Sequence, residues 1–102
     1  MNESNTKRVV VRVKSELYRE YQIYLVKKDI TMKEDITSHI KKQVENYIPP
    51  EPAVNEKEYS NLEYTKANFL IDKDLYSEYK IILIKEKTTP TADIIRYMMY
   101  VV

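Results

Sequence analysis

The sequence contains no cysteine and no glycine, and it has a single histidine, His39. Without cysteine there is no disulfide, no thiolate metal site and no cysteine nucleophile. Without glycine there is none of the glycine-dependent loops that bind phosphates, dinucleotides or calcium. One histidine also disfavours a multi-histidine metal site and a Ser-His-Asp triad. We therefore predict a binding protein that is not an enzyme, with no metal, no cofactor and no small-molecule substrate.

The chain also lacks a long apolar run and a strong net charge. Its 102 residues suffice for one small domain, and no stretch reaches the about 18 apolar residues that a membrane span needs. The net charge is +1, but residues 1–48 hold ten lysines and arginines against seven acidic residues. Residues 49–64, by contrast, hold one lysine and four glutamates. We expect a soluble cytoplasmic protein whose positive charge lies mainly in the first repeat.

An internal repeat at an offset of 58 residues organises the chain. No gap is needed over the matching region, which indicates duplication. The first repeat spans residues 7–48, a proline-containing acidic linker spans 49–65, and the second repeat spans 66–102. The matched residues are Leu17, Tyr18, Glu20, Tyr21, Ile23, Leu25, Lys27, Thr31, Asp35 and Ile36 with Leu75, Tyr76, Glu78, Tyr79, Ile81, Leu83, Lys85, Thr89, Asp93 and Ile94.

Each repeat begins with a short segment of strand periodicity. In residues 7–13 apolar valines alternate with other residues, and residues 66–71 alternate in the same way. One face of the two segments should be buried. The predicted inward residues are Val9, Val11, Val13, Ala67, Phe69 and Ile71, and the predicted outward residues are Arg8, Val10, Arg12, Lys66, Asn68 and Leu70.

Two helices are predicted to follow each strand. The first helices span about 15–28, with Ser15 as N-cap, and about 73–86. The second helices begin after Thr31, with Glu34 completing a capping box, and after Thr89, with Pro90 at the first helical position. The apolar run 81–84 should be buried on more than one side. The predicted buried stripes are Leu17, Tyr21 and Leu25; Leu75, Tyr79 and Leu83; Ile36, Ile40, Val44 and Tyr47; and Ile94, Met98 and Val102.

One strand cannot pair with itself, so the two repeats should share a two-stranded antiparallel ribbon above four helices. At this point the chain resembles tandem ribbon-helix-helix (Arc/MetJ/CopG-like) DNA-binding proteins, such as transcription regulators of archaeal viruses and accessory proteins of plasmid conjugation. The resemblance covers residues 7–48 and 66–102. It implies a mainly α fold with a short β ribbon, in which the two repeats form an intramolecular pseudodimer.

The resemblance also implies sequence-specific binding of double-stranded DNA, with the ribbon in the major groove and the starts of the second helices on the phosphates. Base reading would fall to Arg8, Val10 and Arg12 and to Lys66, Asn68 and Leu70, and the unlike strands predict an asymmetric site. Leu70 departs from the polar pattern of the family, and Pro90 removes one backbone donor. The predicted phosphate-binding residues are Lys7, Lys14, Thr31, Met32, Lys33, Thr89 and Thr91, with Lys27 and Lys28 as further cations.

The expected role is a repressor or activator of viral or plasmid genes. Alternatives are a relaxosome or partition accessory protein, and an antitoxin or adaptor whose second repeat binds a protein. The ten tyrosines favour core or interface positions over nucleic-acid stacking, and His39 favours surface or interface packing over ligation. The pairs Glu34–Asp35 and Asp72/Asp74 favour helix-start charge and solvated turns over catalysis. Half of the apolar end, residues 97–102, should be core; the rest could support homo-oligomers or cooperative assembly on DNA.

Overall fold

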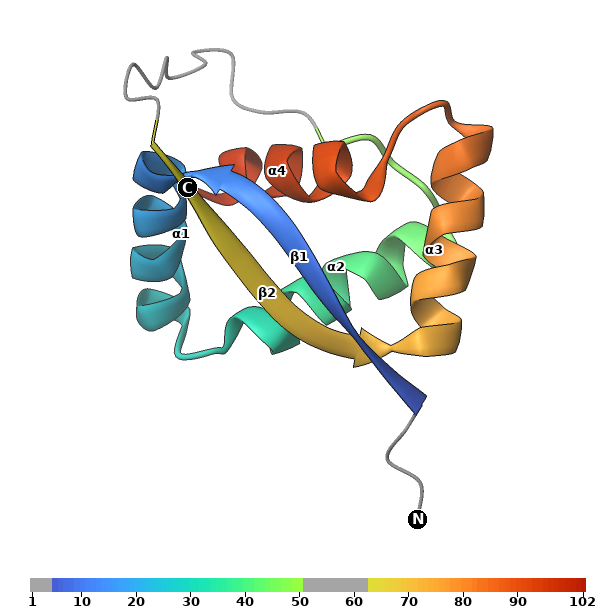
Figure 1. The fold of residues 1–102 in the computed structure, drawn as a ribbon, viewed down its shortest axis with the longest axis horizontal. Coiled ribbons are helices and arrows are strands. Elements are labelled where there is room, and N and C mark those ends of the chain that lie inside the picture. The colour runs from blue at the N-terminus through green and yellow to red at the C-terminus, as the bar shows by residue number, and fades with distance from the viewer. Residues whose placement is uncertain (1–4, 51–62) are drawn as a thin grey trace.

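The computed structural model describes residues 5–50 and 63–102, so most of the predicted linker, residues 51–62, lies outside the described residues. The described chain is mainly helical with a two-stranded antiparallel sheet, as predicted. Each repeat gives one strand and two helices (Figure 1). The elements in order are β1 (Thr6–Lys14), α1 (Ser15–Lys28), α2 (Met32–Glu45), β2 (Tyr64–Asp72), α3 (Lys73–Lys85) and α4 (Pro90–Val101).

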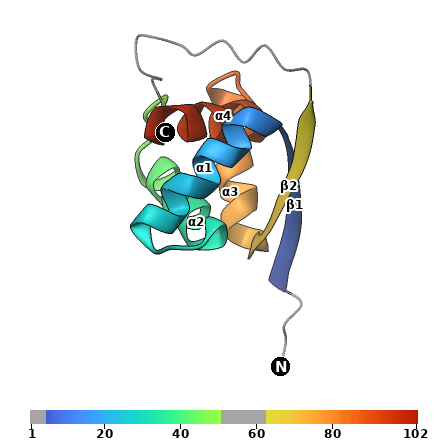
Figure 2. The ribbon, with the colours of Figure 1, turned by 90° about the vertical axis from the view of Figure 1, so that its left-hand side faces the viewer.

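The two strands pair over their whole length and cover one side of the helices (Figure 2). Val10 lies opposite Asn68, so residues at equivalent positions of the two repeats face each other at the centre of the ribbon. Alternation places the predicted apolar face inward, because successive side chains of a strand point to opposite sides. All six predicted inward residues are buried, and all six predicted outward residues are exposed.

The helices of the two repeats are interleaved beneath the ribbon. α2 packs mainly against α3, and α1 packs mainly against α4, whereas the two helices within one repeat make fewer contacts. The core therefore consists of residues from both repeats, and neither repeat buries its apolar stripe alone. The buried apolar residues on the helices are Leu17, Tyr21, Leu25, Ile36, Ile40, Tyr76, Tyr79, Leu83, Ile94 and Met98.

Some predicted details at the helix starts are confirmed and one is wrong. Thr31 and Glu34 form the predicted capping box, and Thr89 caps α4 by accepting a hydrogen bond from the backbone of Ala92. Ser15 is not the N-cap of α1. It is the first helical residue, and its hydroxyl pairs with that of Thr65 on β2 at 2.8 Å. The Ser15 hydroxyl therefore bonds to β2 and is not available to cap the start of α1.

The predicted burial of the run 81–84 is wrong, because Ile81 and Ile84 are exposed while Leu83 is fully buried. A single helix stripe suffices for the core here, so only one side of the run is covered. Several stripe ends also differ from prediction. Leu75, Val44 and Tyr47 are only half-buried, with Tyr47 beyond the end of α2, and Val102 is exposed. In the apolar end, Met98 is buried and Tyr100 is exposed; a contact role for it stays a prediction.

The turns that follow α1 and α3 each contain a left-handed residue at an equivalent position, although the chain has no glycine. Asp29 has φ 57° and Lys87 has φ 59°. In both turns the residue donates its backbone N–H three positions back, to Val26 and Ile84 respectively. A side chain with a Cβ is strained in this conformation, and glycine is the residue that adopts it without cost.

We expect Lys87→Gly to raise the free energy of unfolding by about 0.5–1 kcal/mol, because it relieves left-handed strain. The measurement is urea denaturation followed by circular dichroism. The matched control is Lys85→Gly, which places glycine in the last turn of α3 and should lower stability by about 1 kcal/mol. An equal decrease in the free energy of unfolding in the two variants would contradict the prediction.

A buried polar network lies at the centre of the helices, where the sequence predicted only helix-start charge. Asp35 accepts hydrogen bonds from the hydroxyls of Tyr21 at 2.6 Å and Tyr97 at 2.8 Å. Asp93 accepts them from Tyr79 at 2.5 Å, from His39 Nε2 at 2.8 Å and from Gln43 at 3.1 Å. Asp35 lies in the first turn of α2, as predicted, but it is buried and hydrogen-bonded and not solvated. We name these residues the Asp–Tyr network.

The network follows the internal repeat. Tyr21 and Asp35 occupy the positions of Tyr79 and Asp93, and each aspartate also binds a residue of the other repeat. Those two residues, His39 and Tyr97, are themselves equivalent and stack with ring centroids 4.1 Å apart. Of the two positions predicted for His39, surface or interface, the surface one is wrong, because His39 is buried and packs against Tyr97 between the two repeats. The tyrosines at these positions are core residues, as predicted.

Alkaline pH should destabilise the fold through these tyrosines. Burial, reinforced by the Asp35 carboxylate, raises the pKa of Tyr21 and Tyr97 far above the usual value, and burial with Asp93 does the same for Tyr79. The folded chain keeps these protons above about pH 10, where the unfolded chain releases them. Stability is therefore full below about pH 10 and falls as the pH rises further.

The measurement is tyrosinate absorbance and circular dichroism over the same alkaline titration. We expect part of the tyrosine absorbance change to coincide with loss of helical signal. Ionisation of all ten tyrosines at the ordinary pKa with the helical signal intact would contradict the prediction.

Candidate nucleic-acid interface

The outward face of the ribbon gathers the six predicted base-reading residues in one exposed surface. In register, Arg8 lies opposite Leu70, Val10 opposite Asn68, and Arg12 opposite Lys66. These six side chains include three cations and no acid. The acid nearest along β2, Asp72, is engaged elsewhere: its carboxylate caps α3 through Leu75 and accepts a hydrogen bond from Asn5. We name the six residues the ribbon face.

Arg12 and Lys66 are a like-charge pair in direct cross-strand register. Such a pair destabilises a sheet, and Lys14, one position further on the same strand face, adds a third cation at this end of the ribbon. The Arg12 guanidinium lies over the ring of Tyr64, 4.8 Å from its centroid, which offsets part of the repulsion. A local cost to stability without a structural gain is typical of a functional surface.

Arg8 is held toward the middle of the ribbon face. Its Nη1 donates to Asn68 Oδ1 at 2.6 Å across the strand pair. The bond fixes the direction of the guanidinium and leaves its remaining donors available, because arginine carries five N–H groups. The middle of the ribbon face therefore presents three side chains in a fixed arrangement. They are the hydrogen-bond donor Arg8, the apolar Val10 and the amide Asn68.

The structure separates Lys7 from the ribbon face. Lys7 belongs to the inward alternation of β1, and its ammonium lies 5.7 Å from the ring centroid of Tyr76, with Lys80 at 5.4 Å from the same ring. Lys7 and Lys80 therefore form a cationic cluster beside the helices at one end of the ribbon. Lys80 was not predicted, and neither motif nor periodicity in the sequence points to it.

The start of α2 is less open to an anion than the sequence predicted. Thr31 Oγ1 accepts from the Glu34 backbone, and the Glu34 carboxylate accepts from the Thr31 backbone and hydroxyl. These hydrogen bonds lower the pKa of Glu34, so its negative charge is fixed at the helix start. Met32 is half-buried and Lys33 is exposed. A phosphate there would meet the Lys33 cation but also the Glu34 carboxylate.

The start of α4 has no such carboxylate. Ala92 stands where α2 has Glu34, Thr91 is exposed, and Asp93 is turned into the core. Thr89 is exposed and its hydroxyl already accepts from Ala92. Pro90 removes one donor, as predicted, but the absence of a competing acid makes this start the more favourable one for an anion.

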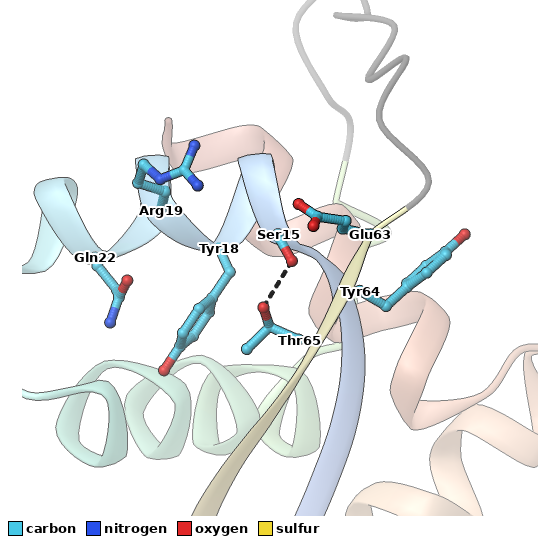
Figure 3. Close-up of a pocket in the computed structure, with 7 residues that line it drawn as sticks. All are labelled: Ser15, Tyr18, Arg19, Gln22, Glu63, Tyr64 and Thr65. Atoms are coloured by element: carbon cyan, nitrogen blue, oxygen red, sulfur yellow. Dashed lines mark hydrogen bonds between the residues drawn. The ribbon is translucent and has the colours of Figure 1, made fainter.

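A hollow of about 490 Å³ opens between α1 and the start of β2 (Figure 3). Tyr18, Arg19 and Gln22 line it from α1, and Glu63 lines it from the chain before β2. Arg19 is an exposed cation near the ribbon end that the sequence predictions missed. Because Glu63 lines the same hollow as Arg19, the hollow is not an anion site of its own, and we assign the hollow no ligand.

Within residues 5–50 and 63–102, no group of three or more histidine, cysteine, aspartate or glutamate side chains is placed to hold a metal ion. No helix in this part of the chain is long and apolar enough to cross a membrane. Comparisons with protein-family models, with curated proteins and with solved structures find no match to the chain.

Proposed function

We propose that the protein binds double-stranded DNA in a sequence-specific manner through the ribbon face and acts as a transcription regulator of viral or plasmid genes. The observation that carries the proposal is the ribbon face itself: six exposed outward side chains that include three cations and no acid, with a like-charge pair in register. A two-stranded ribbon fits the major groove, where its outward side chains meet base edges.

We further propose that the two repeats form an intramolecular ribbon-helix-helix pseudodimer. The pairing of Val10 with Asn68, the stack of His39 on Tyr97 and the repeated Asp–Tyr contacts all relate equivalent positions of the two repeats. Such relations support a pseudo-twofold axis through the middle of the ribbon. The regulatory role rests on the resemblance to ribbon-helix-helix proteins.

The chemistry of the ribbon face supports an asymmetric recognition sequence. Arg8 and Arg12 offer donor forks suited to guanine, Asn68 suits adenine, and Val10 suits a thymine methyl group. The equivalent positions on the other strand carry different side chains, so the two half-sites differ. Phosphate binding by Lys14, by Lys7 with Lys80 and by the α4 start adds affinity that falls with salt.

The test is selection of bound sequences from a random duplex pool, with wild type compared with the double variant Arg8→Ala, Arg12→Ala. We expect wild type to enrich a motif and the variant to lose it while keeping its circular dichroism spectrum, because each lost base contact removes about 1–3 kcal/mol of discrimination. The matched control, Lys41→Ala with Lys42→Ala on α2, removes the same charge and should keep the motif. Absence of duplex binding by folded wild type at low salt would overturn the proposal.

A further inference from the structure

A second hollow, of about 560 Å³, opens between α2, α4 and the chain that follows α2. Figure 2 shows the carboxyl end of α4 and the chain after α2 on the side of the helices away from the ribbon. The volume lies within the range of about 300–1,000 Å³ that is usual for a site that takes a small molecule. We name this hollow the α2–α4 pocket. Its lining includes His39, Lys42, Pro49, Pro50, Tyr97 and Tyr100.

Both repeats contribute equivalent positions to the α2–α4 pocket. At the 58-residue offset His39 is equivalent to Tyr97, and Lys42 is equivalent to Tyr100. The pocket therefore lies about the proposed pseudo-twofold axis, on the side away from the ribbon. The two members of each pair differ in chemistry, so the pocket has a cation at Lys42 and an aromatic ring at the equivalent position.

The lining of the pocket is rich in flat rings. His39 is buried and yet lines the pocket, so it belongs to the floor, where it stacks on Tyr97 with the ring planes 18° apart. Tyr100 is 61% exposed, and Pro49 and Pro50 add two further rings from the chain after α2. A planar aromatic group packs well on such surfaces and covers apolar area that the fold leaves open.

The wall that carries Pro49 and Pro50 is held in place by Gln43. The Gln43 amide donates to the Ile48 carbonyl at 2.9 Å and accepts from the Ile48 backbone N–H at 3.0 Å. The same amide nitrogen also donates to Asp93 at 3.1 Å, which joins this wall to the Asp–Tyr network. The wall is therefore in position before a ligand binds, so binding does not have to order it.

Lys42 gives the pocket its charge. Among the described residues that line the pocket, Lys42 is the one with a permanent charge, and none is an aspartate or glutamate. In the described part of the chain no carboxylate lies within ion-pair distance of its ammonium. Asp93 lies beneath the floor, but it is buried and already accepts hydrogen bonds from three side chains. The hollow between α1 and β2 differs, because there Glu63 accompanies Arg19.

We propose that the α2–α4 pocket binds a small aromatic carboxylate, with its ring on the aromatic lining and its carboxylate on Lys42. Burial of the ring supplies most of the affinity, and the charge-assisted hydrogen bond to the ammonium selects an acid. Such a ligand is bound and released unchanged. Because residues of both repeats line the pocket, the bound ligand adds contacts between the repeats and stabilises the folded chain. This binding does not depend on the proposed function.

The test compares two probes that share one ring and differ in charge. Indole-3-acetate is an aromatic carboxylate, and tryptamine is an aromatic cation. The chain has no tryptophan, so indole fluorescence anisotropy reports the probe alone when protein is added without DNA. We expect wild type to bind indole-3-acetate roughly threefold or more tightly than tryptamine, because only the acid gains the Lys42 contact. We also expect indole-3-acetate to raise the unfolding temperature.

Variants locate the site. Lys42→Ala should weaken the binding of indole-3-acetate roughly three- to tenfold and should not weaken the binding of tryptamine. The matched control is Lys41→Ala, which removes an exposed lysine outside the pocket and should leave both affinities within about twofold. Tyr100→Ala removes an exposed ring and should weaken the binding of both probes.

Three outcomes would overturn the proposal. They are equal affinity of wild type for the two probes, equal effects of Lys42→Ala and Lys41→Ala, and absence of binding to folded wild type at about 1 mM indole-3-acetate. Because no DNA is present, each of these outcomes leaves the proposed duplex binding unaffected.

Discussion

Replacement of Asp93 with alanine should leave the protein largely unfolded at room temperature. Asp93 is 1% exposed and accepts hydrogen bonds from Tyr79, His39 and Gln43. Its removal leaves three buried polar groups without their hydrogen-bond acceptor, and each such group lowers the free energy of unfolding by about 1–3 kcal/mol. Small domains are stable by only about 5–15 kcal/mol. The expected loss of several kcal/mol therefore removes much or all of the stability.

The measurement is urea denaturation, with thermal unfolding as a second probe. Asp74→Ala is the matched control, since it removes an exposed aspartate from the first turn of α3 and should change stability by about 0.5 kcal/mol or less. Asp35→Ala leaves only two tyrosine hydroxyls without an acceptor. We therefore expect it to lower the free energy of unfolding by less than Asp93→Ala does. An Asp93→Ala variant as stable as the Asp74→Ala control would refute the view that the Asp–Tyr network holds the two repeats together.

The strands and the ribbon face were the most predictable part of the molecule. Alternation in residues 7–13 and 66–71 determined which side chains face inward, because the period of a strand is fixed at two. The 58-residue offset then favoured pairing of the two strands with each other. Helix starts with Thr31 and Thr89 were also predictable, since capping depends on neighbours within one turn.

The Asp–Tyr network was not predicted, because its partners come from distant parts of the chain. Asp35 sits in the first turn of α2, where an acid is normally explained by the helix dipole. Its bond to Tyr97 spans 62 positions. One signal was present: both members of the pairs Tyr21–Asp35 and Tyr79–Asp93 are retained in the repeat. A polar residue retained with an aromatic residue at the same spacing is a sign of a buried pair.

Two surface features were missed for a different reason. The apolar content of the run 81–84 predicts burial on more than one side, whereas the two-layer arrangement covers only one side of α3. Lys7 stays a predicted phosphate-binding residue, and the sequence alone did not show that alternation places it on the inward side at the ribbon end, near Tyr76. Composition gives the amount of charge or apolar surface, and tertiary packing decides where it lies.

Lys66→Glu should change folding and DNA binding in opposite directions. Lys66 lies directly opposite Arg12, so the substitution turns a like-charge pair into an ion pair. Cross-strand pairs of opposite charge contribute about 0.2–1 kcal/mol, so the free energy of unfolding should rise by a similar amount. On DNA the same change replaces a cation with an anion in the groove. Affinity should fall roughly tenfold or more, with a shallower dependence on salt.

The two effects are measured on one preparation, by urea denaturation and by fluorescence anisotropy with a duplex that wild type selects. Lys41→Glu on α2 provides the control, because it makes the same charge change on an exposed helix position outside the ribbon face. If both variants weakened binding equally, net charge alone would account for the loss. Opposite signs for stability and binding in Lys66→Glu alone would identify the Arg12–Lys66 pair as a repulsion that the fold tolerates and that an anionic ligand relieves.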